Sequence, residues 1–250
     1  MALLTADGVR IEAAYQPCTD QSAAAADRPA IVVAHGFTGA LDRPGVRRAA
    51  AVFARRSAVI TFSFRGHGRS GGRSTIGDRE VLDLAAAVAW ARSLGHGRVA
   101  TVGFSMGGSV VLRHGALYGP PSGAHADAVV SVSAPARWYY RGTAPMRRLH
   151  WAVSRPAGRL VARWGLRTRI HPEDWDPVPL SPTEAAPLIA PRPLLIVHGD
   201  RDTYFPLEHG HALARAGHPA RTELWIERGF GHAENSAGAE LLERIAAWAH

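Results

Sequence analysis

One short stretch decides the fold of this chain, and it reads Val99-Ala100-Thr101-Val102-Gly103-Phe104-Ser105-Met106-Gly107-Gly108-Ser109-Val110-Val111. An apolar run rich in β-branched residues stops at a serine, and a pattern of small and apolar residues typical of a helix follows at once. The stretch therefore predicts a strand, a tight turn and a helix. Gly103 and Gly107 allow a cramped turn with a positive φ angle, which would lift the hydroxyl of Ser105 clear of the sheet. Ser105 is thus a candidate nucleophile, although a Gly-x-Ser-x-Gly pentamer also occurs in ordinary glycine-rich turns.

The composition favours one globular domain. The chain has 250 residues, of which 46% are hydrophobic and 20% charged, and α/β domains of this size are common. Cys18 is the only cysteine, so no disulfide can form within the chain. The first residues lack a basic leader, and no apolar run reaches the roughly 18 residues of a membrane span. We therefore expect a cytoplasmic protein that is not integral to a membrane.

The formal charge of +8 comes from arginine alone, because the chain contains no lysine. Such a charge can favour anionic ligands or membrane surfaces. We do not expect a nucleic-acid partner, since abundant arginine together with abundant alanine, glycine and proline is explained first by a coding bias. We expect a monomer or a homodimer.

Apolar runs and helical patterns alternate along most of the chain. Strands are expected at 30–34, 58–64, 98–104, 127–133, 193–199 and 222–226, with an edge strand over 9–13. Helices are expected at 46–55, 78–94 with Asp78 as cap, 106–118, 206–216 and 239–248. This alternation predicts a doubly wound, mostly parallel sheet, whose functional sites lie beyond the carboxyl ends of the strands.

The alternation is interrupted between residues 135 and 191. This segment predicts a small, partly helical cap over the sheet edge, and it holds nine arginines between residues 137 and 169 without an acidic residue. Its aromatic residues include Trp138, Tyr139, Tyr140, Trp151 and Trp164. Two interpretations stay open: a solvated helical face whose tryptophans pack on the core, or aromatic rings that line an acyl pocket beside arginines that meet an acidic substrate or an anionic membrane.

A serine nucleophile needs a base to take its proton and a carboxylate to orient that base. Asp202 lies just past the strand 193–199, and His232 lies in a glycine-flanked turn past the next strand. Together with Ser105 they follow the chain order Ser, Asp, His, and three loops at one sheet edge can converge. Asp200 competes for the carboxylate role, but we expect it to brace the turn through backbone amides.

Five motifs resemble those of the α/β-hydrolase superfamily over nearly the whole chain: His35-Gly36-Phe37, Gly66-His67-Gly68-Arg69-Ser70, Gly103 to Gly108, His198 to Asp202, and Gly231-His232. The resemblance implies an eight-stranded sheet with helices on both faces, and an oxyanion hole made by the backbone amides of Phe37 and Met106. More closely, the chain is similar to bacterial esterases of the cinnamoyl or feruloyl type, and to serine-aminopeptidase-like and monoacylglycerol-lipase-like groups. One departure is Ser63, where many relatives have an aspartate that braces the loop.

These residues predict a serine hydrolase, a carboxylesterase that cleaves a small carboxylic ester without a cofactor. Alternatives on the same triad are a thioesterase, a monoacylglycerol lipase and an aminopeptidase, and an alternative of another class is a non-catalytic ligand-binding or membrane-docking protein of this fold. Other candidates have structural explanations. We expect loop-bracing roles for His35, His67 and His198, an incidental thiol at Cys18, and no zinc site at Glu208, His209 and His211.

Overall fold

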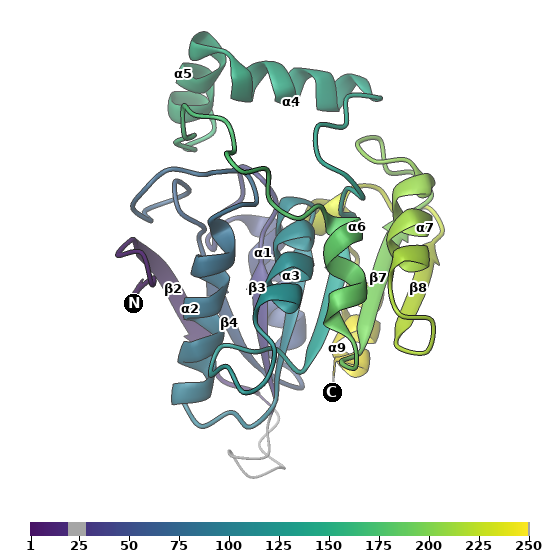
Figure 1. The fold of residues 1–250 in the computed structure, drawn as a ribbon. Helices are drawn as coiled ribbons and strands as arrows, with labels where there is room; N and C mark the ends of the chain where they lie inside the picture. The colour runs from purple at the N-terminus through teal and green to yellow at the C-terminus, as the bar shows by residue number, and fades with distance from the viewer. Residues whose placement is uncertain (20–28, 250) are drawn as a thin grey trace.

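An eight-stranded sheet forms the centre of the molecule (Figure 1). The structure is a computed structural model that describes residues 1–19 and 29–249. The strands are β1 (Ala2–Leu4), β2 (Arg10–Gln16), β3 (Ala30–Ala34), β4 (Ala58–Phe62), β5 (Val99–Phe104), β6 (Ala128–Val132), β7 (Leu194–Gly199) and β8 (Thr222–Glu227). Their spatial order is β1-β2-β4-β3-β5-β6-β7-β8. Strands β3 to β8 are parallel, whereas β2 pairs antiparallel with both β1 and β4.

The predicted doubly wound sheet is confirmed, and one edge differs from the prediction. The strand expected at 9–13 is not the edge strand, because β1 pairs outside it. With only three residues, β1 is too short to show an alternating pattern, which is why the sequence did not indicate it.

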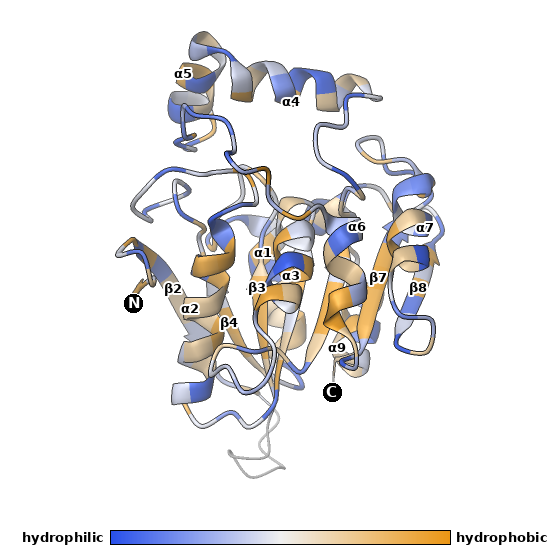
Figure 2. Ribbon diagram, in the orientation of Figure 1, coloured by the Kyte–Doolittle hydropathy of each residue, from blue (hydrophilic) through white to orange (hydrophobic). Residues whose placement is uncertain are grey.

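Helices cover both faces of the sheet (Figure 1). One face carries α2 (Glu80–Ser93), α3 (Met106–Leu117), α6 (Pro182–Ala185), η2 (Ala186–Ile189) and α7 (Leu207–Ala216), and the other carries α1 (Pro44–Phe53), α8 (Ala233–Ser236) and α9 (Ala239–Trp248). In β3, Val32 packs on the face that carries α3, and the next residue, Val33, packs on the face that carries α1. Burial on both sides explains the continuous apolar runs of the central strands, which are orange in Figure 2.

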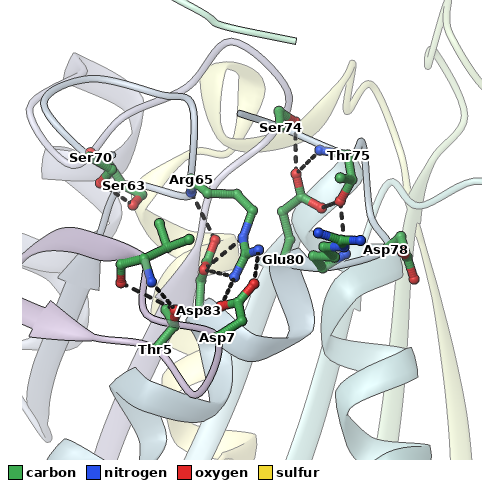
Figure 3. Close-up of polar contacts among 12 residues, drawn as sticks. Thr5, Asp7, Ser63, Arg65, Ser70, Ser74, Thr75, Asp78, Glu80 and Asp83 are labelled. Atoms are coloured by element: carbon green, nitrogen blue, oxygen red, sulfur yellow. Dashed lines mark hydrogen bonds and ion pairs between the residues drawn. The ribbon is translucent and has the colours of Figure 1, made fainter. Parts of the chain in front are cut away.

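A buried ionic cluster holds the loop between β4 and α2 (Figure 3). The Arg65 guanidinium donates to Asp83 Oδ1 at 2.8 and 3.0 Å and to both oxygens of Asp7. Next to this cluster, the carboxylate of Glu80 accepts hydrogen bonds from the loop just before α2. Asp78 does not cap α2 as expected. Its carboxylate accepts a hydrogen bond from Arg113 instead, and Glu80 satisfies the amides before the helix.

Two helices, α4 (Ala144–Ser154) and α5 (Pro156–Gly165), lie over the edge at which the parallel strands end (Figure 1). The chain returns from them along the loop after β4, where Thr168 pairs with His67 and Ile170 with Ser74. The last part of the predicted cap segment, residues 182–189, packs against α3 instead, and Ile189 is buried in the core. Within residues 1–19 and 29–249, no helix has the length and apolar character needed to cross a membrane.

Candidate active site

Ser105 stands in a strained turn between β5 and α3. Its φ and ψ angles are 52° and −115°, a conformation that costs a non-glycine residue about 1–3 kcal/mol. The positive φ therefore falls on Ser105 itself, and the flanking glycines serve a different purpose. A Cβ on Gly103 would lie 2.1 Å from the carbonyl oxygen of Gly107, and a Cβ on Gly107 would lie 2.2 Å from that of Ala34. Only glycines let the helix approach the two central strands this closely.

Three side chains from three loops meet in one hydrogen-bonded line. The Ser105 hydroxyl lies 3.0 Å from His232 Nε2, and His232 Nδ1 lies 2.8 Å from Asp202 Oδ2. Since a carboxylate only accepts, Nδ1 carries the proton and Nε2 is free to accept the serine proton. The line begins at Ser105, at the carboxyl end of β5, where β5 lies beside β3 and the strand order reverses. Sites of doubly wound sheets are found at such points.

The surroundings of Asp202 stabilise the ionised form of its carboxylate. Its Oδ1 accepts the amides of Tyr204 at 2.8 Å and Phe205 at 3.0 Å, while Oδ2 faces His232. Burial acts to raise the pKa of Asp202, but the hydrogen bond and charge of His232 and the two amides outweigh it and lower the pKa below its usual value. Asp200 instead accepts the amide of Gly229 at 2.6 Å, in the turn before His232. This is the bracing role expected for it.

The imidazole of His232 is held by packing as well as by hydrogen bonds. The Tyr204 ring stacks on it at a centroid distance of 4.2 Å and an interplanar angle of 21°. The backbone amide of His232 donates to Ser236 Oγ at 3.1 Å, which fixes the start of the short helix α8. The stack with Tyr204 and the bond to Asp202 therefore orient the ring, and Ser236 holds the backbone that carries it.

The loop after β3 lies beside the nucleophile. A Cβ on Gly36 would lie 3.4 Å from the Cβ of Ser105. Among the described residues, no hydrogen bond accepts the amide of Phe37 or of Met106. Met106 also begins α3, whose N-terminal dipole favours negative charge. Two free amides near Ser105 are the donors that an oxyanion requires.

Glu234 is a residue of this region that the sequence did not single out. Its buried carboxylate accepts the Gly36 amide at 3.0 Å, and burial raises its pKa above the usual value. Arg48 donates to the Glu234 carbonyl at 2.6 Å and so fixes the backbone of α8. Glu234 thus connects the turn that carries His232 to the loop that carries Phe37. The one sequence feature that could have indicated Glu234 is its position, two residues after His232 at the start of a helix.

The other histidines near the site brace loops. His35 Nδ1 lies 2.7 Å from the Gly36 carbonyl and Nε2 accepts the Phe64 amide at 3.0 Å, and burial lowers its pKa to about 3. His198 Nε2 donates to the Phe205 carbonyl at 2.8 Å, on the loop that carries Asp202. His209 Nδ1 accepts the amide of Ala136. In the part of the chain that the structure describes, no group of three potential ligands could hold a metal.

A carboxylate braces the loop beside Ser63, and Glu12 supplies it. Ser63 Oγ donates to Glu12 Oε1 at 2.8 Å, and the same carboxylate accepts the amide and the guanidinium of Arg69. The loop between β4 and α2 is therefore braced by a carboxylate that comes from β2.

The five aromatic residues of the predicted pocket lie in separate places. Tyr140 is nearest the triad, because its ring packs on His209 at 4.4 Å and on Phe205, which contacts His232 at 5.6 Å. Trp138 and Tyr139 gather around Trp175. Trp151 is 52% exposed and Trp164 77% exposed. The structure brings only Tyr140 close to the candidate triad through ring contacts.

Comparison with known proteins identifies the fold. A family model described as "alpha/beta hydrolase fold" matches residues 29–151. Solved structures with the same fold include an esterase of Pyrococcus furiosus (TM-score 0.72, 21% identity, 99% of this chain and 90% of that chain) and the Butyrivibrio proteoclasticus protein Est1E with bound ferulic acid (0.62, 19%, 98% and 95%). A third is DcsB in complex with its substrate analogue (0.76, 19%, 100% and 97%). A search of curated protein sequences found no match.

The chain therefore has the α/β-hydrolase fold, and the fold that its motifs indicated is confirmed. At these sequence identities the solved structures define the fold and leave the chemistry to be argued from the site itself.

Proposed function

We propose that this protein is a serine hydrolase that cleaves a small carboxylic ester through an acyl-enzyme intermediate. The observation that carries the proposal is the continuous hydrogen-bonded line from Asp202 through His232 to Ser105, with distances of 2.8 and 3.0 Å. Both distances lie within the reach of proton transfer, about 2.6–3.2 Å.

In the first half of the reaction, Ser105 Oγ attacks the ester carbonyl carbon while its proton passes to His232 Nε2. Asp202 stabilises the imidazolium that forms. The carbonyl oxygen becomes an oxyanion that accepts hydrogen bonds from the amides of Phe37 and Met106. Losing one such donor typically costs about 2.7–4 kcal/mol. As the tetrahedral intermediate collapses, His232 protonates the leaving alcohol, and the acyl group stays on Ser105.

In the second half, His232 takes a proton from water, which attacks the acyl-enzyme. The second intermediate collapses, Ser105 regains its proton from His232, and the free acid leaves. No cofactor enters either step. The same steps would cleave a thioester or an amide, so the thioesterase, lipase and aminopeptidase alternatives differ only in the substrate that the site accepts.

Labelling with a fluorophosphonate probe tests the nucleophile. We expect the wild-type protein to be labelled and the Ser105→Ala variant not. The matched control is Ser109→Ala, a buried serine one turn further along α3. Absence of labelling in the wild type would favour the non-catalytic alternative. Rates on p-nitrophenyl esters of increasing acyl length, aryl esters, acyl thioesters and aminoacyl amides would then define the substrate class.

A further inference from the structure

Helix α5 buries its small residues against α4 and exposes its large apolar side chains. Gly158 and Ala162 are buried, and a Cβ on Gly158 would lie 2.5 Å from the Cα of Ala152 in α4. Leu160, Val161 and Trp164 are instead 58%, 56% and 77% exposed. Trp164 follows Val161 by three residues and Leu160 by four, so the three side chains share one side of the helix. We call these three residues the outer face of α5.

Single exposed apolar residues are ordinary on protein surfaces, but a contiguous set marks an interaction site. The two helices form the outermost layer of the molecule over the active-site edge (Figure 1), and they mix hydrophobic and hydrophilic residues along their length (Figure 2). Trp151 on α4 adds a further ring that is half exposed. The partner of this surface therefore has to offer an apolar environment.

The same helices carry a one-signed charge. Nine arginines lie between residues 137 and 169, four of them within α4 and α5 and the others just before, between or after these helices, and the sequence has no acidic residue from 128 to 172. Arg148, Arg155 and Arg163 are exposed, and within the described residues none of them pairs with a carboxylate. The Arg163 guanidinium lies 5.3 Å from the Trp164 ring centroid, at the border of the outer face. The partner therefore has to be negatively charged as well.

We propose that α4 and α5 dock this protein on an anionic lipid bilayer, with the outer face of α5 inserted at the headgroup level. A bilayer satisfies both requirements, because it offers acyl chains to Leu160, Val161 and Trp164 and phosphates to the arginines. A nucleic acid would meet the charge but leave the aliphatic side chains in water. A second copy of the chain would place arginines against arginines.

Docking would set the active site next to the membrane. Thr143, the residue before α4, donates its hydroxyl to the Tyr204 carbonyl at 2.9 Å, and the Tyr204 ring stacks on His232. The docking helices are thus anchored to the loop that carries Asp202, whose Tyr204 ring packs on the candidate general base. Binding to the bilayer does not itself depend on the proposed hydrolysis, so the two proposals fail separately.

The test is co-sedimentation of the full chain with vesicles of phosphatidylcholine alone and of phosphatidylcholine mixed with phosphatidylglycerol. We expect binding to the mixed vesicles that weakens with added salt. Replacing Arg148 and Arg163 by glutamine should weaken it about 25-fold, since a basic residue near an anionic surface contributes about 1 kcal/mol. Trp164→Ala should weaken it about tenfold through lost apolar burial.

The matched control is the pair Arg56→Gln and Arg98→Gln, two exposed arginines just before β4 and β5, at the sheet edge opposite the one that α4 and α5 cover. This pair changes the net charge equally and should lower binding only slightly. Equal binding to both vesicle types, or an equal loss in control and test pairs, would overturn the proposal. A dimer in sedimentation velocity that Trp164→Ala dissociates would also overturn it, as would RNA binding that requires the arginines but not Trp164.

Discussion

Replacing Asp202 by asparagine tests the orientation of His232 without removing a side chain. In the wild type, Oδ1 accepts the amides of Tyr204 and Phe205, and Oδ2 accepts the proton on His232 Nδ1. Only the oxygen of asparagine can face the two amides, so its NH2 group must face His232. Nδ1 then has to accept, and the ring proton moves to Nε2. A protonated Nε2 cannot take the proton of Ser105.

The expected loss in kcat is about 10⁴-fold, equivalent to about 5.5 kcal/mol of transition-state stabilisation, because the favoured tautomer is the inactive one. KM should change little, since Asp202 lies behind His232 and away from the substrate. The assay is steady-state hydrolysis of a p-nitrophenyl ester that the wild type cleaves, with circular dichroism to show that the variant is folded.

The control is Asp200→Asn. Asp200 braces the Gly229 amide from an exposed position, and asparagine keeps a carbonyl oxygen for that bond, so kcat should stay within about threefold of the wild type. A larger loss in Asp200→Asn than in Asp202→Asn would refute the assignment of the triad carboxylate. A tenfold loss or less in Asp202→Asn would refute the tautomer argument.

Three further predictions concern the surroundings of the site. Glu234→Ala leaves the buried Gly36 amide unpaired and should lower kcat by about 10- to 100-fold with little change in KM, whereas Glu234→Gln, which keeps an acceptor, should retain most of the activity; equal kcat values would exclude the positioning role. Gly103→Ala should destabilise the fold by at least about 1–3 kcal/mol in urea denaturation, because the new methyl group meets a backbone oxygen at 2.1 Å, while Gly119→Ala, with open space around it, should be neutral. Arg65 lowers the pKa of Asp7 to about 2; the wild type should therefore be more stable than Asp7→Asn above about pH 4, and the difference should vanish as the pH falls toward 2, which thermal melts across that range can check.

The elements that could be predicted are those whose pattern is local. The strand 30–34 has the predicted bounds and the helix 239–248 likewise, because burial on both faces or on one stripe leaves a clear period in the sequence. The convergence of Ser105, Asp202 and His232 could be predicted for a related reason, since each follows a strand and parallel strands end at one edge.

The parts that could not be predicted depend on contacts between distant residues. Glu234 reaches Gly36 across 198 positions, and no periodicity or turn motif encodes such a bond. Likewise, Tyr140 and Trp164 occur in one aromatic and arginine-rich segment of the sequence. Only the structure shows that Tyr140 lies beside the candidate triad and that Trp164 lies on the outer layer.

The Glu12–Ser63 pair has a consequence for how this chain can vary. The loop after β4 needs one carboxylate, and here β2 supplies it. A substitution of Ser63 by aspartate would set a second acid within about 3 Å of Glu12, and the two charges would repel each other. It becomes harmless only if Glu12 is neutralised first, for example by glutamine. The two positions are therefore physically coupled, and the order in which they are substituted decides whether two unpaired acids ever face each other.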